Sequence, residues 1–553
     1  MEEGQTQHMH PIGAQAAVAA HAHPAPAGHE HDRTPPHKSH GGTSKFLKDR
    51  YLVAALIITA ISAIYWTMFA SNAYSTFHEY DDLGIFAHNM WLDINYPGIS
   101  SGLQYLVFGN HISPDLVLLV LPFFAIAQSS LTLLVIQVLF SSAAAISVFF
   151  ISRDLLKSNG LAMLFFIAFL VNPGVNGMLV FDFHIESLIT IFYLLAFYFY
   201  IKLRKRLFIL SSILLLATFE EAPYLGATLA IGLLVYEFLY NRKGSGEASP
   251  QRIRLAAMLL GLSILFFVVY QGITIFLLQS YSSGSYSSLP PYLKVGPGVF
   301  LSLFIYHGAT ASAGAPLTYT LYALVVGILF VGGAALIDPI VTLVLASAYL
   351  GELFVVGNSG FVYVFQQYFS FIIGPVIVAG VLGIMLLQAR KGYLGRMLAK
   401  WEESGKKPIP YVLIIASSLA IANILILWAY PSFVLSRNTN NLAQDFLFQV
   451  SPAQHAYYQQ LYSVMALIPN NASLTAPFFT TPHLMNRLYL QDTGYTMPIW
   501  YFKPEYILID VNLNVSLNAY AGIDQLRQYL NQTSNYTIYA RNGSAILLRY
   551  AGP

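Results

Sequence analysis

Long apolar runs separated by short polar breaks fill residues 51–430 of the chain. A helix needs about 20 apolar residues to cross a bilayer, and only helices satisfy their own backbone hydrogen bonds in lipid. The pattern therefore predicts a polytopic bundle of about 11 spanning helices. We expect them near residues 51–71, 130–152, 159–180, 185–202, 206–219, 222–240, 255–279, 317–335, 338–356, 364–388 and 409–430.

The apolar run 113–127 is too short to be counted with these spans. At ~1.5 Å per residue it covers roughly 22 Å of a ~30 Å core, so we interpret it as a re-entrant or interfacial helix. The lysine- and arginine-rich breaks then fall on one side, which is the cytoplasmic side by the positive-inside rule. The sequence thus predicts a multi-pass protein of the plasma (cell) membrane with a cytoplasmic N-terminus, an external C-terminus and a first external loop at 72–129.

Two polar regions flank the bundle. Residues 1–50 carry eight histidines among Ala, Pro and Gly, which predicts a disordered tail. We favour a solubilising role for this tail, with binding of a soft divalent metal as the alternative. Residues 431–553 read as a small external α/β domain, with strands at 474–478, 506–510, 536–539 and 545–548 and a helix at 523–530. Asn542-Gly543 suggests a type I′ hairpin turn.

Glycosylation sequons occur only in this C-terminal region. Five confined to one segment favour an external, glycosylated face, with chance occurrence in an Asn-, Thr- and Ser-rich region as the alternative. The acceptor positions are Asn471, Asn514, Asn531, Asn535 and Asn542.

The composition excludes several classes of protein. Hydrophobic residues make up 56% and charged residues 10%, whereas a soluble domain is nearer one-quarter charged. The net charge of +2 provides no basic surface for nucleic acid, so we expect no nucleic-acid partner. The chain has no cysteine, which removes disulfides, thiolate metal ligands and cysteine nucleophiles.

Carboxylates and imidazoles gather at the predicted external membrane boundary. Ionisable groups near the bilayer usually face a cavity, and this set could bind a divalent metal such as Mg²⁺ or Mn²⁺ or provide a general base. Such a pocket suits a lipid with a phosphate head. The candidate site residues are Asp81, Asp82, His111, Asp182, His184, Glu186, Glu220 and Glu221, with His111 and His184 as possible metal ligands.

Each motif also has a structural interpretation. Asp81-Asp82 could simply cap the helix that follows. Asp182, His184 and Glu186 would share one side of an extended segment but would spread around a helix.

Four short motifs together resemble a family catalogued as domain of unknown function 2079, common in archaea. Residues 80–86 with Trp91 resemble its YDLGIFDQALW pattern, and 110–114 (NHISP) resemble its HFSP motif. Residues 181–186 (FDFHIE) are similar to its FHPE motif, and 219–221 (FEE) to its KED motif. The resemblance covers about residues 51–550 and excludes the histidine-rich tail.

That family looks like a distant relative of the GT-C glycosyltransferases, which use polyprenyl-phosphate-linked sugars at the external membrane face. The resemblance implies that Asp82, with Asp81 as its neighbour, is the catalytic base or a metal ligand. It implies a polyprenyl phosphate lipid as partner. Some polar positions of the family are replaced here, including proline by Ile185. The alternative is therefore a non-enzymatic accessory subunit with a GT-C-like scaffold and membrane-protein partners, and a transporter is less favoured.

Overall fold

The computed structural model describes residues 49–78, 81–96, 113–241, 248–280, 324–351, 367–405, 410–434, 450–492, 503–510 and 535–552. Residues Arg50–Pro553 form one compact unit. Nearly all of the histidine-rich tail lies outside the described residues, so its predicted disorder and metal binding stay predictions.

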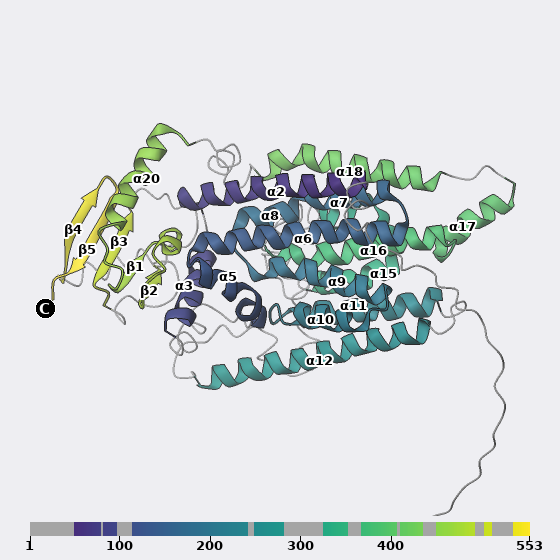
Figure 1. The fold of residues 1–553 in the computed structure, drawn as a ribbon, viewed down its shortest axis with the longest axis horizontal. Helices are drawn as coiled ribbons and strands as arrows, with labels where there is room; N and C mark the ends of the chain where they lie inside the picture. Colours follow the sequence, from purple (N-terminus) through teal and green to yellow (C-terminus); the bar gives the residue numbers. More distant parts are fainter. Residues whose placement is uncertain are drawn as a thin grey trace, which may run out of the picture. The chain divides into compact units, whose positions relative to one another are not determined.

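Helices make up most of the described chain (Figure 1). The α-helices are α2 (Arg50–Ser75), α3 (Asp81–Asn95), α5 (Leu121–Ile126), α6 (Ser130–Leu156), α7 (Asn159–Val171), α8 (Pro173–Phe181), α9 (Ile189–Ile201), α10 (Lys205–Leu216), α11 (Ala222–Tyr236), α12 (Ala248–Ser280), α15 (Pro339–Gly351), α16 (Ser370–Gln388), α17 (Gly392–Glu403), α18 (Tyr411–Val434) and α20 (Pro452–Met465). Shorter 3₁₀ or π segments are η1 (Leu116–Val120), η2 (Ile185–Leu188), η3 (Glu237–Asn241), η5 (Ala334–Ile337), η8 (Gln367–Phe369) and η9 (Phe478–His483).

Within the described ranges, six helical segments are long and apolar enough to cross a membrane. Every predicted span coincides with a helix at least in part, although several of these helices are shorter than a bilayer requires. The number of 11 crossings therefore stays a prediction. The six segments are Arg50–Ser75, Ser130–Leu156, Asn159–Phe181, Ala222–Asn241, Pro250–Tyr270 and Ser370–Glu403.

Local signals explain where the helices of the candidate site begin and end. Ser129 caps α6 by accepting a hydrogen bond from the backbone N–H of Leu131. Asn172 ends α7 and caps α8, whose first residue is Pro173, because proline fits the first turn but interrupts a continuing helix. The run 159–181 is therefore a broken helix, and its second half ends at Phe181.

α16 is the central helix of the bundle. In its most apolar 18-residue window, 94% of the positions are buried, whereas the corresponding share for α2 is 28%. Gly374 allows close approach to α9, because a Cβ there would come within 2.8 Å of the ring of Tyr193. The apolar core consequently surrounds α16, and α2 presents large apolar side chains outward as expected of a lipid-facing helix.

The C-terminal segment forms a five-stranded sheet in the order β2-β1-β3-β5-β4. Its strands are β1 (Leu474–Ala476), β2 (Leu490–Asp492), β3 (Tyr506–Asp510), β4 (Tyr536–Asn542) and β5 (Ala545–Tyr550), with β2, β1 and β3 parallel and the β3–β5 and β4–β5 pairs antiparallel. The predicted strands are present, and the predicted helix at 523–530 lies outside the described residues.

The turn between β4 and β5 differs from the prediction. Asn542 pairs with Ala545, so the two-residue loop is Gly543-Ser544 and not Asn542-Gly543. Within this loop φ is positive at Gly543 alone, at +59°, which is the pattern of a type II′ turn. The type I′ prediction was wrong because Asn542 still belongs to the strand ladder.

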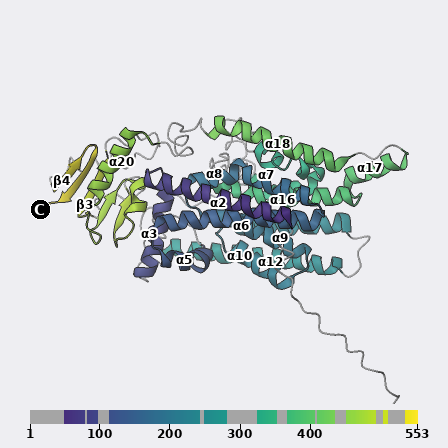
Figure 2. The ribbon, with the colours of Figure 1, turned by 45° about the horizontal axis from the view of Figure 1, so that its top comes forward.

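α3 lies between the helical bundle and η9 of the C-terminal segment (Figures 1 and 2). Gly84 permits this contact, because a Cβ at position 84 would collide with the side chain of Thr481. The Nδ1 atom of His88 lies 2.7 Å from the carbonyl oxygen of Met485. Ser130, at the start of α6, donates a hydrogen bond of 2.7 Å to the carbonyl of Pro482. The C-terminal segment therefore holds α3 against the bundle.

Candidate functional site

The segment after α8 is extended before it turns into η2. Asp182 has φ 167° and ψ −171°, and His184 has φ −139° and ψ 137°, so both residues adopt extended backbone conformations. This places the carboxylate of Asp182 and the imidazole of His184 on one side, with Oδ1 and Nδ1 3.6 Å apart. Glu186 lies in the following 3₁₀ turn.

Asp82 meets His184 although the two residues are far apart in sequence. The Nε2 atom of His184 lies 2.8 Å from Oδ2 of Asp82. The side chain of His184 is 4% exposed, that of Asp182 is fully buried, and that of Asp82 is 38% exposed. The three side chains thus form a chain from the interior to an accessible carboxylate, with the imidazole in the middle.

The backbone of α3 is fixed to the same group. The N–H of Leu83 donates a hydrogen bond of 3.1 Å to Oδ2 of Asp182. This N–H belongs to the first turn of α3, where backbone donors lack a partner within the helix. Asp182 therefore helps to cap α3 from outside, while Asp82 bonds His184. The same contacts thus cap α3 and bring Asp82 to His184. Asp82 is therefore more than a helix-capping residue.

Gln137 in α6 holds the extended segment in place, and the sequence did not single it out. Its Nε2 donates hydrogen bonds of 2.7 Å to the carbonyls of Met178 and Asp182, and its Oε1 accepts one of 2.8 Å from the backbone N–H of His184. The only signal was a lone amide inside the apolar run 130–152. An amide buried at this depth requires such partners.

Aromatic rings surround the imidazole of His184. The ring of Phe181 lies 5.2 Å away and that of Phe86 6.2 Å away, measured between centroids. Phe86 also packs edge-to-face on Phe183 at 5.4 Å. Since Phe86 follows Asp82 by one helical turn, one face of α3 carries both the carboxylate and this apolar cover. The rings exclude water from the buried part of the site.

The other candidate residues are placed less completely. Glu186 is 1% exposed, and neither of its carboxylate oxygens has a hydrogen-bond partner among the described residues. Glu220 and Glu221 are half-buried at the start of α11. His111 and the side chain of Asp81 lie outside the described residues. Across the described ranges, no three His, Asp or Glu side chains form a group able to hold a metal ion.

Asp115 is a further buried acidic residue, and it was not among the predicted site residues. It is fully buried at the start of η1, and burial raises its pKa to about 7 despite a long hydrogen bond of 3.5 Å from Thr218. Its backbone N–H bonds the carbonyl of Ala217, which ties η1 to the turn that precedes Glu220. This carboxyl group is therefore partly protonated at neutral pH.

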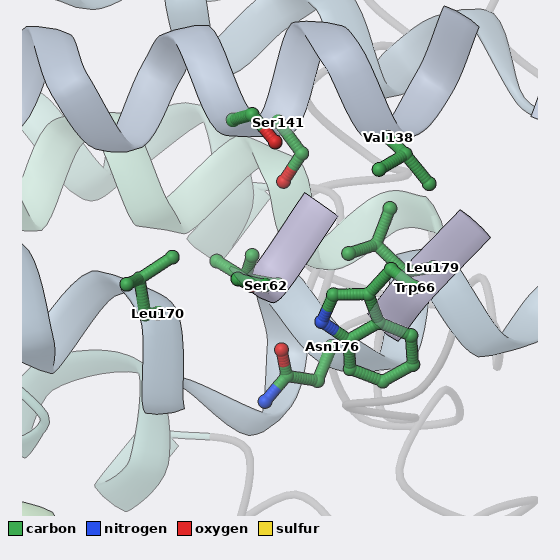
Figure 3. Close-up of a pocket in the computed structure, with 9 residues that line it drawn as sticks. Ser62, Trp66, Val138, Ser141, Leu170, Asn176 and Leu179 are labelled. Atoms are coloured by element: carbon green, nitrogen blue, oxygen red, sulfur yellow. The ribbon is translucent and has the colours of Figure 1, made fainter. Parts of the chain in front are cut away.

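A small polar pocket lies elsewhere, between α2, α6 and the broken helix α7–α8 (Figure 3). Its cavity volume is about 10 Å³, and Ser62, Ser141 and Asn176 line it together with the ring of Trp66. Its lining includes no charged residue and none of the residues of the Asp82–His184 group. The pocket has room for about one water molecule, and it is separate from the candidate site.

Of the predicted glycosylation positions, Asn471 and Asn542 are exposed and Asn535 is half-buried. Asn542 also donates a hydrogen bond of 2.9 Å to the hydroxyl of Ser463. Asn514 and Asn531 lie outside the described residues. Modification of these positions stays a prediction.

Comparison with known proteins adds two findings. The model of a family described as "Predicted membrane protein (DUF2079)" matches residues 63–547, which confirms the resemblance read from the motifs. Among solved structures, the chain is similar to the crystal structure of ArnT from Cupriavidus metallidurans bound to undecaprenyl phosphate, with 11% identity, a TM-score of 0.44 and coverage of 90% of this chain and 99% of that one. That similarity by itself assigns no activity to this chain. No curated protein matches.

Proposed function

The chain belongs to the DUF2079 family of predicted membrane proteins, and we propose that it transfers a sugar from a polyprenyl-phosphate donor to a hydroxyl acceptor at the external membrane face. The observation that carries this proposal is the row of side chains from buried Asp182 through His184 to the accessible carboxylate of Asp82, in which His184 lies 3.6 Å from Asp182 and is hydrogen-bonded to Asp82 at 2.8 Å. The GT-C resemblance of the sequence motifs assigns the base role to the same residue. We place the site at the external face because the lysine- and arginine-rich segments between the predicted spans all fall on the opposite side of the membrane, which we take as cytoplasmic.

Asp82 acts as the general base in this proposal. Its carboxylate takes the proton of the acceptor hydroxyl while the acceptor oxygen bonds to the anomeric carbon of the sugar. The bond between that carbon and the phosphate oxygen breaks, and its electron pair leaves with the lipid phosphate. Transfer by one direct displacement inverts the anomeric carbon and needs a single base.

His184 acts as a positioning residue. An ionised carboxylate can only accept hydrogen bonds, so the Nε2 atom of His184 carries the hydrogen that is shared with Asp82. Gln137 fixes the backbone of His184, and Asp182 lies beside its other ring nitrogen. This arrangement leaves the imidazole little freedom to rotate, and it keeps the Asp82 carboxylate oriented toward the accessible side.

A divalent cation, Mg²⁺ or Mn²⁺, belongs to the proposal only as an accessory. The donors of the site are carboxylates and an imidazole, which suit such ions, and the accessible Asp82 is the carboxylate that would reach one. The ion would screen the phosphate of the donor from the acidic residues. His111, the other predicted imidazole ligand, lies outside the described residues.

Asp82→Asn tests the assignment. Asparagine keeps the size and caps a helix about as well as aspartate, but it cannot take a proton. With the full chain in vesicles and a panel of polyprenyl-phosphate sugars, we expect transfer to fall by about two orders of magnitude or more. Asp93→Asn on the same helix is the matched control and should keep its activity.

Full activity of the Asp82→Asn protein would remove Asp82 from the mechanism. If the wild-type chain transfers no sugar from any donor in the panel, the enzyme proposal fails and the accessory-subunit alternative takes its place.

A further inference from the structure

α17 is a short helix held between two apolar helices. It begins four residues after the end of α16 at Gln388, and α18 begins at Tyr411, soon after α17 ends at Glu403 (Figure 1). The chain turns at the junction, where φ is +54° at Arg390 and +71° at Gly392. Both ends of α17 are therefore tethered close to the ends of helices in the bundle.

Contacts fix the rotation of α17 about its axis. The guanidinium of Arg390 forms a two-pronged ion pair with Glu402, with N···O distances of 2.5 and 3.2 Å. Lys391 donates a hydrogen bond of 2.8 Å to the carbonyl of Tyr240. Gly395 and Leu398 are buried against the bundle. The side of the helix that carries them is thus covered by protein.

The next side around the helix is apolar and exposed. Tyr393, Met397 and Trp401 follow each other at intervals of four residues, which aligns them in one stripe. They are 76%, 50% and 41% exposed. This stripe is therefore not part of the helix face that is buried against the bundle. Tyrosine and tryptophan are the residues that concentrate at the membrane–water boundary.

Two cations adjoin the stripe. At 100° per residue, Lys400 lies about 20° and Arg396 about 60° around the helix from Tyr393. Both side chains are exposed, and within the described part of the chain neither forms an ion pair. Lysine and arginine beside an aromatic stripe match the phosphates of anionic lipids, which lie just outside the acyl chains.

We propose that α17 is an interfacial helix whose Tyr393–Met397–Trp401 stripe enters the membrane surface at the end of α16 and whose Arg396 and Lys400 bind anionic lipid headgroups. The partner of the stripe is a lipid surface, because the chain connects both ends of α17 to helices of the bundle, α16 and α18. The alternatives that the experiment must exclude are a stripe covered by a second copy of the chain and a stripe exposed to water. The surface does not depend on the proposed sugar transfer.

The chain has no cysteine, so single labels can be placed without removing native thiols. A spin label at Met397→Cys would report on the stripe, and one at Glu403→Cys, about 120° around the helix, is the matched control. In vesicles we expect the label at 397 to meet lipid-soluble oxygen several-fold more often than a water-soluble nickel complex, and the label at 403 to show the reverse. Equal access of the nickel complex to both labels would overturn the proposal.

Protection of the 397 label from both reagents, or a disulfide-linked dimer of the Met397→Cys protein, would mean that protein covers the stripe and would equally overturn the proposal.

The cations are tested with a fluorophore at Met397→Cys and brominated lipids that quench it. At low salt, two cations worth about 1 kcal/mol each predict up to about a 30-fold preference for anionic phosphatidylglycerol over phosphatidylcholine. Arg396→Gln with Lys400→Gln, or added salt, should reduce this ratio toward one. A wild-type ratio near one, or an unchanged ratio in the double variant, would contradict headgroup binding.

Discussion

Acid should loosen the contact between α3 and the C-terminal segment through His88. The side chain is 2% exposed, and its Nδ1 lies 2.7 Å from the carbonyl oxygen of Met485. Burial lowers the pKa of His88 from 6.5 to about 4, opposed by the hydrogen bond to Met485 and assisted by the nearby cation of Arg487. α3 is not among the helical segments of the described chain that are long and apolar enough to span a membrane.

The size of the effect follows from the difference between the two pKa values. Above pH 6.5 the imidazole is neutral in both the closed and the open state, so the contact keeps its full stability. As the pH falls from 6.5 toward 4, the open state takes up the proton first, and the contact loses about 1.4 kcal/mol per pH unit. The total loss is roughly 3 kcal/mol, or a few hundred-fold in the opening equilibrium, and below pH 4 no further loss comes from His88.

Thiol protection measures this opening. Met485 belongs to the C-terminal segment but is buried in the apolar core of the bundle, so a Met485→Cys thiol should react only when the contact opens. An aromatic disulfide, which reacts with thiols even in acid, gives the rate at each pH. The comparison is between Met485→Cys alone and the same protein with His88→Gln, because glutamine can still donate to the carbonyl but does not titrate.

The ratio of the two rates should change by two orders of magnitude or more between pH 7 and pH 4. Taking a ratio is necessary because His483, whose pKa burial also lowers to about 4, titrates in both proteins. A ratio that stays constant with pH would refute the assignment of the acid sensitivity to His88.

Three further predictions concern other parts of the molecule. Single cysteines at Asn159 and Ala453 should react with an impermeant reagent from opposite sides of the membrane, and reaction of both from one side would contradict the topology. Gly84→Ala should destabilise the protein toward heat, and Thr481→Gly in the same chain should restore part of the loss by removing the colliding side chain, so equal losses with and without Thr481→Gly would exclude the collision. The raised pKa of Asp115 means that its contribution to stability is complete below pH 3.8 and is lost as the pH rises through about 7. Asp115→Asn should therefore flatten the decline of the unfolding midpoint temperature over this pH range. An unchanged dependence of the midpoint on pH would contradict this role of Asp115.

The helices could be predicted from the sequence because apolar runs in lipid have only one way to satisfy their backbone. Their pairing could not be predicted in the same way. Asp82 and His184 were both candidates, but the 2.8 Å contact between them depends on the break at Asn172, on the extended backbone after α8 and on the position of α3. None of these is encoded by the periodicity of a single segment.

Residues that act by satisfying backbone groups were the hardest to predict. Gln137 is a single amide in an apolar run, and its role depends on where the end of α8 lies. β2 and α20 were also missed, because three residues are too few to show alternation and α20 carries a polar sequence. The predicted turn was one position too early, at 542–543 instead of 543–544. Element boundaries inferred from the sequence pattern are uncertain by a few residues, so the pattern cannot resolve this difference.

The burial of α16 has a consequence for the biosynthesis of the chain. This helix packs on α6, α9, α15 and η5, yet it is made after all of them. At about 5–20 residues per second, roughly 230 residues separate the completion of α6 from that of α16, a delay of about ten seconds to most of a minute. Until then the ring of Tyr193, which later packs on Gly374, has no α16 to cover it. The surface that α16 will cover therefore stays open in the nascent bundle, and the rate of translation determines when it is covered.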